Sequence, residues 1–152
     1  MNVLIDTNVI LDAMTAREQF SQAAQTIFLL AADDAFIGFI TASSATDIYY
    51  LIHKYGRIGG ESFSASECKE KMRKLYELFK PLDVNEADCI AALELDMKDY
   101  EDAIMAAVAK RHKIEYIVTR NLPDFKNSPV QAIPPDRFAD IFLKGNKHND
   151  KN

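Results

Sequence analysis

The apolar run Val3-Leu4-Ile5 ends directly in the polar cluster Asp6-Thr7-Asn8. A short run rich in β-branched residues and closed by turn formers is typical of a buried strand. Further strands are predicted at 36–41, 82–84, 116–119 and 130–133. Helical spacing predicts helices at 21–32, 44–55, 66–79, 86–97, 99–112 and 135–143. Strands that alternate with helices predict an α/β domain with a mainly parallel sheet.

The composition fits one globular domain. The chain has 152 residues, of which 48% are hydrophobic and 27% are charged. We expect a domain over residues 1–144 followed by a polar tail, 145–152. The apolar stretch 27–32 is too short to span a bilayer. Cys68 and Cys89 are too few for a disulfide framework, which favours a reduced, cytoplasmic protein without membrane attachment.

Charge is unevenly distributed along the chain. The net charge of −5 argues against non-specific coating of nucleic acid. Residues 83–102 contain eight acids and one lysine, whereas 53–80 and 110–126 each carry a net charge of +3. This pattern suits a cation site beside a surface that attracts an anion, and it equally suits solvated helix faces.

Two acids fall where ligands bind in parallel sheets, beyond the carboxyl ends of the strands. Asp6 follows the first strand, although a helix cap or turn would also explain an aspartate there. Asp124 follows the strand at 116–119, and Thr119 and Asn121 place a hydroxyl and an amide beside it.

Three further acids lie in predicted helices. Asp47 sits at the margin of an apolar face, where it is either solvated or directed at a cation. Asp99 fits a helix N-cap and Asp102 the third helical position, where the helix dipole alone stabilises an acid. The alanine-rich helix that follows is expected to pack centrally, with its N-terminus near the sheet edge.

Several carboxylates gathered at one sheet edge repel one another and raise each other's pKa, unless a cation neutralises them. Ligand sets made only of oxygen select Mg²⁺ or Mn²⁺ rather than zinc. Such an ion activates water and orients a phosphodiester for cleavage. The hypothesis for the site is therefore metal-dependent hydrolysis of a phosphate ester.

Four segments resemble the motifs of PIN domains, in the order in which that family has them. They are Val3-Leu4-Ile5-Asp6-Thr7-Asn8-Val9-Ile10-Leu11-Asp12, Ser43-Ser44-Ala45-Thr46-Asp47-Ile48-Tyr49-Tyr50, Asp99-Tyr100-Glu101-Asp102-Ala103-Ile104-Met105-Ala106-Ala107 and Tyr116-Ile117-Val118-Thr119-Arg120-Asn121-Leu122-Pro123-Asp124-Phe125. The resemblance spans 2–142, and within the family it is strongest to VapC-like toxins of bacterial toxin–antitoxin pairs.

The resemblance implies a three-layer α/β/α fold and an endoribonuclease that depends on Mg²⁺ or Mn²⁺. It also implies a cognate antitoxin and a homodimer. The catalytic acids carried over are Asp6, Asp47, Asp102 and Asp124, of which Asp6, Asp102 and Asp124 would hold the metal. The polar residues around them would be Asn8, Asp99, Thr119 and Asn121. Asp99 competes with Asp102 for the third place, and Asp47 stands where the family most often has the longer glutamate.

Basic residues would steer RNA toward these acids. Lys69, Arg73, Tyr76 and Lys80 are predicted on one helix face, opposite the apolar stripe. The residues expected to bind RNA are Lys54, Arg57, Lys69, Arg73 and Arg120. A solvated helix face is the alternative interpretation.

Two other function classes compete with the nuclease. One is a binding module of the same fold with little or no activity, which acts through protein partners; Asp47 in place of glutamate favours it slightly. The other is a phospho-accepting receiver-like domain. The sequence disfavours that class, because Arg120 rather than lysine follows the late strand and Asp6 lies in no DxD pattern.

Overall fold

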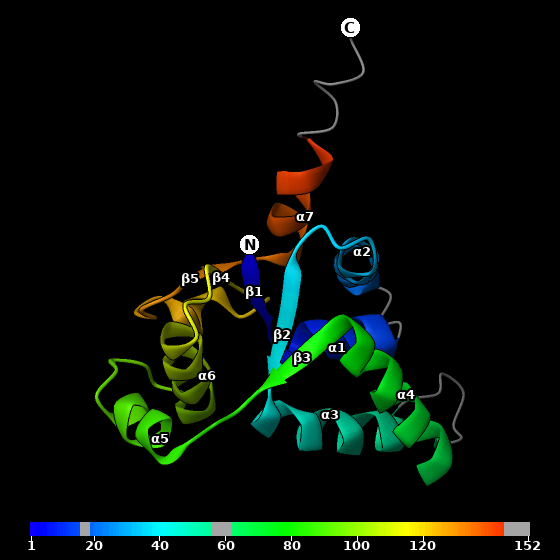
Figure 1. Ribbon diagram of the computed structural model, residues 1–152, viewed down its shortest axis with the longest axis horizontal. Coiled ribbons are helices and arrows are strands. Elements are labelled where there is room, and N and C mark those ends of the chain that lie inside the picture. Colours follow the sequence, from blue (N-terminus) through cyan, green and yellow to red (C-terminus); the bar gives the residue numbers. More distant parts are fainter. Residues whose placement is uncertain (16–18, 56–61, 145–152) are drawn as a thin grey trace, which may run out of the picture.

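Five parallel strands form one sheet in the order β3-β2-β1-β4-β5 (Figure 1). The computed structural model describes residues 1–15, 19–55 and 62–144. The strands are β1 (Asn2–Ile5), β2 (Ile37–Thr41), β3 (Phe79–Leu82), β4 (Tyr116–Val118) and β5 (Gln131–Ile133). Strand β1 is central and pairs with β4 in a register that sets Ile5 opposite Val118. The residues that follow, Asp6 and Thr119, therefore emerge side by side.

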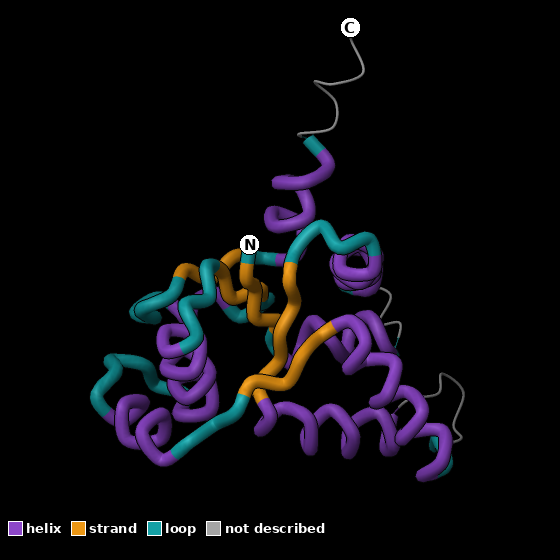
Figure 2. The backbone as a smooth tube through the Cα atoms, in the orientation of Figure 1, coloured by secondary structure: helices purple, strands orange, loops and turns teal. Residues whose placement is uncertain are grey.

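Helices cover both faces of the sheet (Figure 2). The helices are α1 (Thr7–Met14), α2 (Ser21–Ala32), α3 (Ala42–Tyr55), α4 (Ala65–Leu78), α5 (Glu86–Leu93), α6 (Tyr100–Arg111) and α7 (Pro135–Leu143). Val3 and Ile5 pack into a core with α1 to α4 and α7, whereas Leu4 packs into a second core with α6. Successive strand residues point to opposite faces, so this one run supplies both cores. The predicted three-layer α/β/α fold is confirmed.

Helix α1 was not predicted from the sequence. It begins at Thr7, directly after Asp6, and the Asp6 carbonyl accepts hydrogen bonds from the backbone N–H groups of Val9 and Ile10. The prediction missed this helix because Asp, Thr and Asn favour turns. The same residues are also common at helix starts. The buried side chains of Val9, Ile10 and Leu11 hold the helix against the sheet.

The third strand lies at 79–82 rather than at the predicted 82–84. Phe79 and Leu82 are buried, whereas Lys80 and Pro81 are exposed. This strand is at the sheet edge, where a proline without an N–H group is tolerated. Placing Lys80 on a helix face was therefore wrong, because α4 ends at Leu78.

Helix α5 is shorter than predicted and ends at Leu93 rather than at residue 97. The chain leaves the helix where the Asp96 carbonyl accepts a hydrogen bond from the Asn127 amide at 3.0 Å. This contact, with a residue 31 positions away, is not visible to local spacing.

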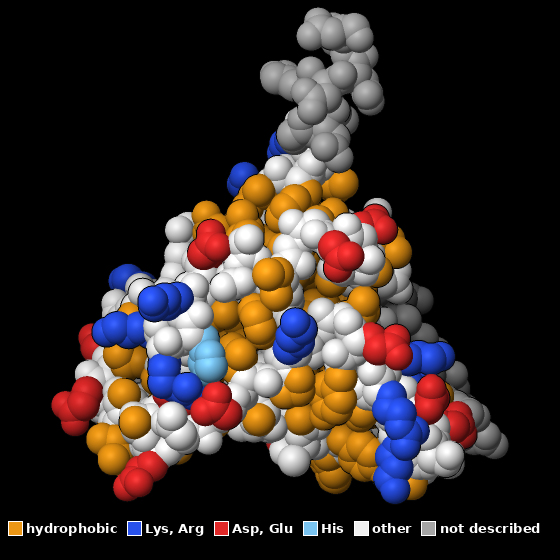
Figure 3. Space-filling view, viewed as in Figure 1, with side chains coloured by type: hydrophobic (Ala, Val, Ile, Leu, Met, Phe, Trp, Pro, Cys, Tyr) orange, Lys and Arg blue, Asp and Glu red, His pale blue; other side chains and the backbone are white. Residues whose placement is uncertain are grey.

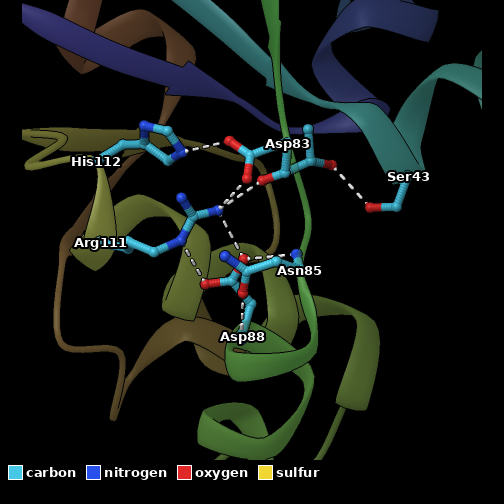
Figure 4. A network of polar contacts seen from close by, with 7 residues as sticks. Ser43, Asp83, Asn85, Asp88, Arg111 and His112 are labelled. Carbon is cyan, nitrogen blue, oxygen red and sulfur yellow. Dashed lines mark hydrogen bonds and ion pairs between the residues drawn. The ribbon is translucent and has the colours of Figure 1, made fainter.

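Arg111, in the last turn of α6, fixes that helix to α5 and to the segment before it (Figure 4). Its guanidinium donates to both carboxylate oxygens of buried Asp88 at 2.8 Å and to the carbonyl of Asp83 at 2.8 Å. His112 Nε2 lies 3.1 Å from Asp83 Oδ1, and the Asn85 backbone N–H donates to Asp88 at 3.0 Å. The hydrogen bond from Arg111 lowers the pKa of Asp88. These contacts position α6, whose other end carries Asp102.

Neither cysteine is in a disulfide, and Cys68 is buried. Within the ranges that the structure describes, every helix is too short or too polar to cross a membrane.

Candidate active site

The side chain of Asp6 turns away from the helix that it precedes. The residue occupies the N-cap position of α1, yet its carboxylate forms no capping hydrogen bond. Instead Oδ2 accepts from the Thr119 hydroxyl at 2.7 Å and from the Asn8 amide at 3.0 Å. Asp6 is buried, and burial raises its pKa, against the lowering effect of the Thr119 hydrogen bond. A cap therefore does not explain this aspartate.

Thr119 links the ends of β1 and β4. Its hydroxyl oxygen accepts from the Asn121 backbone N–H at 3.0 Å while donating to Asp6. Asn121 in turn donates from its side-chain amide to Asp124. The structure thus brings Asn8, Thr119 and Asn121 beside two of the acids that the sequence singled out.

Arg120, the residue after Thr119, forms an ion pair with Asp12 on α1. Its Nε lies 2.5 Å and its NH2 3.2 Å from the Asp12 carboxylate, which is fully buried. The guanidinium also stacks on Phe20, with Cζ 4.1 Å from the ring centroid. Its positive charge partly opposes the increase in the pKa of Asp6 that burial causes. Arg120 is therefore paired with Asp12 within the protein, whereas the sequence predicted that it binds RNA.

Asp102 lies in the first turn of α6, next to the cap residue Asp99. The Asp99 carboxylate accepts from the Asp102 backbone N–H at 3.0 Å, as expected of an N-cap. Partial burial raises the pKa of Asp102 to about 7, and the negative charges of Asp6, Asp99 and Asp124 add to this effect. Burial and the neighbouring negative charges thus both favour the protonated form of Asp102.

Glu101 is a member of the cluster that sequence reasoning missed. Its pKa is raised by partial burial, and the negative charges of Asp47, Asp99 and Asp6 add to this effect. Asp47 is exposed on α3, and Glu101 is the acid of the cluster on which its charge acts. The signal was the run Asp99-Tyr100-Glu101-Asp102, where three acids in four residues open one helix.

Asp124 borders a polar cavity of about 390 Å³ on the other side of the cluster. It lies in the short 3-10 helix η1 (Leu122–Phe125), which continues the connection after β4. Lys98 and Lys126 line the same cavity, so it carries positive as well as negative side chains.

The acids fit a hard divalent cation by donor type and by charge. We define the acidic cluster as the carboxylates whose charges raise one another's pKa, namely Asp6, Asp47, Asp99, Glu101, Asp102 and Asp124. The positive charge of Arg120 opposes this effect at Asp6. Beside Asp6, the buried Thr7 hydroxyl has no hydrogen-bond partner. Among the described residues, no group of three or more Asp, Glu, His or Cys side chains is placed to hold a metal ion. Mg²⁺ binds proteins through as few as one or two carboxylates and keeps several waters.

The predicted RNA-binding residues fall in different places. Lys69 and Arg73 lie on α4 and face α3 across a hollow. Lys54 lies near the end of α3, with its ammonium 4.9 Å from the centroid of Tyr55. Arg57 and the predicted tail 145–152 lie outside the described residues.

Comparison with known proteins identifies the family. A family model described as PIN domain matches residues 2–123. The chain belongs to the PIN domain family, whose members are in general nucleases. A search of curated proteins finds no match.

Solved structures share the fold at low sequence identity. VapBC2 from Rickettsia felis, bound to a DNA fragment from its promoter, has a TM-score of 0.64 and 17% identity, covering 88% of this chain and 98% of that chain. A toxin–antitoxin complex from Klebsiella pneumoniae has a TM-score of 0.62 and 21% identity, covering 88% and 97%. FitAcB from Neisseria gonorrhoeae has a TM-score of 0.61 and 19% identity, covering 88% and 97%.

Proposed function

We propose that this PIN domain is an endoribonuclease that uses Mg²⁺ or Mn²⁺ and acts as the toxin of a toxin–antitoxin pair. The observation that carries the proposal is the buried Asp6 carboxylate, which Thr119 and Asn8 hold where β1 and β4 end, with the charge of Asp6 contributing to the raised pKa of Asp102. Such a concentration of carboxylates is unfavourable in the free protein and becomes favourable when a cation binds.

Asp6, Asp102 and Asp124, the ligands implied by the resemblance, would hold the ion. Because no three acids among the described residues are placed to bind it together, at least one of them would act through a bound water. When bound, the ion would polarise the phosphate and activate water for in-line attack. Thr119 and Asn8 fix the Asp6 carboxylate by hydrogen bonds, so this ligand is oriented before the ion arrives. Asn121 does the same for Asp124. Arg120 offsets part of the negative charge at Asp6 while its own position is held by Asp12.

The proposal that the protein is a toxin also implies binding partners. The similar structures are toxin–antitoxin complexes, which supports an antitoxin protein as the regulator of this chain. We propose RNA as the substrate, a homodimer as the assembly and the cytoplasm as the location.

Asp47 supports one alternative, a PIN-fold binding module with weak activity. It is one carbon shorter than glutamate, is exposed, and approaches the other acids through Glu101. If Glu101 takes the position that a longer acid would occupy, activity is retained.

The test is cleavage of defined single-stranded RNAs by the purified protein in Mg²⁺ or Mn²⁺, with a chelator control. Asp6→Asn removes a charged ligand and is expected to abolish cleavage. Asp33→Asn, at the exposed end of α2 before β2 begins, should cut normally. Cleavage at the wild-type rate by Asp6→Asn would overturn the assignment. Expression in bacteria tests the toxin role, because only the wild type should arrest growth.

A further inference from the structure

A hollow of about 430 Å³ lies between α3 and α4. Ala45, Thr46 and Tyr49 line it from α3, while Lys69, Arg73 and Tyr76 line it from α4. Its volume falls within the range of small-ligand sites, about 300–1,000 Å³. On the face shown in Figure 3, hydrophobic and Lys/Arg side chains gather side by side over these two helices.

The lining combines aromatic rings with cations. Tyr49 is partly buried and Tyr76 is 39% exposed, so the Tyr76 ring is accessible from solvent. Within the described residues, Lys69 has no acidic partner. Arg73 pairs with Glu70 at 3.1 Å, but both side chains are exposed, and such surface pairs are worth at most about 1 kcal/mol. Both positive charges are therefore available to an anionic ligand.

The hollow and the acidic cluster share one helix. Thr46 lines the hollow, and the next residue, Asp47, faces Glu101. If one phosphate of an RNA strand lies at the acidic cluster, the neighbouring nucleotide can therefore lie along α3, toward the hollow. Lys69 and Arg73 are one helical turn apart on α4, so their charges form a short track.

We propose that this hollow is a nucleotide subsite, which takes one unpaired base of the RNA next to the cleaved phosphate. The Tyr76 ring stacks on the base, and Lys69 and Arg73 hold its phosphate. The inference rests on the proposed function for the substrate class. Aromatic rings combined with cations are typical of surfaces that bind single strands. A base inside a duplex cannot enter a hollow of this kind without unstacking, so the subsite selects single-stranded RNA.

The test measures binding separately from cleavage. A fluorescently labelled 12-nucleotide single-stranded RNA is titrated into protein that carries Asp6→Asn, and anisotropy gives the Kd. Tyr76→Ser removes the stacking ring, whereas Tyr76→Phe keeps it. Lys69→Gln removes a charge from the hollow, whereas Lys74→Gln removes the same charge from α4 outside it.

Stacking on one ring is worth about 1–3 kcal/mol, so Tyr76→Ser should raise the Kd about five-fold or more while Tyr76→Phe stays within two-fold. Lys69→Gln should weaken binding more than Lys74→Gln. Equal affinities within either pair would overturn the subsite.

Failure of the subsite is distinguishable from failure of the nuclease proposal. If the wild type cuts RNA but Tyr76→Ser binds normally, only the subsite is wrong. If the wild type does not cut RNA but Tyr76→Ser still loses affinity, only the nuclease assignment is wrong.

Discussion

Replacing Asp102 with asparagine should stabilise the metal-free protein above neutral pH. Burial and the charges of Asp6, Asp99 and Asp124 raise the pKa of Asp102 from 3.8 to about 7. An acid with a raised pKa binds its proton more tightly in the folded state, so ionising it costs stability. This cost is absent below about pH 4, grows between pH 4 and 7, and is complete above pH 7.

The magnitude follows from that shift. About three pKa units correspond to an upper limit of about 4 kcal/mol. Asp102 is only half-buried, so solvent screening reduces this figure, to roughly 2 kcal/mol. Asparagine also loses the favourable interaction of an acid with the helix dipole, worth about 0.3–1 kcal/mol. We therefore expect a net gain of about 1–2 kcal/mol in the free energy of unfolding, or about 2–8 °C in Tm.

The assay is thermal unfolding with a chelator at pH 8 and at pH 4.5. Asp136→Asn is the matched control for the loss of an acid from a first helical turn, because Asp136 occupies the first turn of α7. Asp102→Asn should gain stability over this control at pH 8 and lose most of that advantage at pH 4.5. A loss of stability at pH 8 that exceeds the loss in the control would refute the reasoning.

Three further predictions concern ion pairs and charge. Arg120→Met leaves the buried Asp12 carboxylate unpaired and should lower the free energy of unfolding by about 3 kcal/mol in urea denaturation. Arg111→Met should cost about 2 kcal/mol at pH 7. Because Arg111 lowers the pKa of Asp88, this difference should persist above pH 4 and shrink as Asp88 becomes protonated in more acidic solution. Lys69→Gln should reduce the slope of log affinity for RNA against log salt by about 0.7, and an unchanged slope would discard its steering role.

The sequence predicted the layers and the sheet because its signals are local. Val3-Leu4-Ile5 is apolar on both faces, as a central parallel strand must be. The short edge strand was misplaced because Pro81 normally ends an element, and only its place at the sheet edge makes it acceptable.

The site was predictable where a residue follows a strand and less so where contacts join distant segments. Asp6 and Asp124 were found because strand ends mark ligand sites. The pairing of Arg120 with Asp12 spans 108 residues, and no spacing rule indicates it. Glu101 was missed because Asp102 lies beside it, and only the fold shows that α3 brings Asp47 to Glu101.

The central claim is that these carboxylates form a cation site, and Mn²⁺ binding at pH 8 tests it most directly. Electron paramagnetic resonance of free Mn²⁺ gives the bound fraction without any substrate. We expect the wild type and Asp33→Asn, a change at the exposed end of α2, to bind the ion, and Asp6→Asn and Asp102→Asn to bind it at least ten-fold more weakly. Equal Mn²⁺ binding by all four proteins would contradict the account.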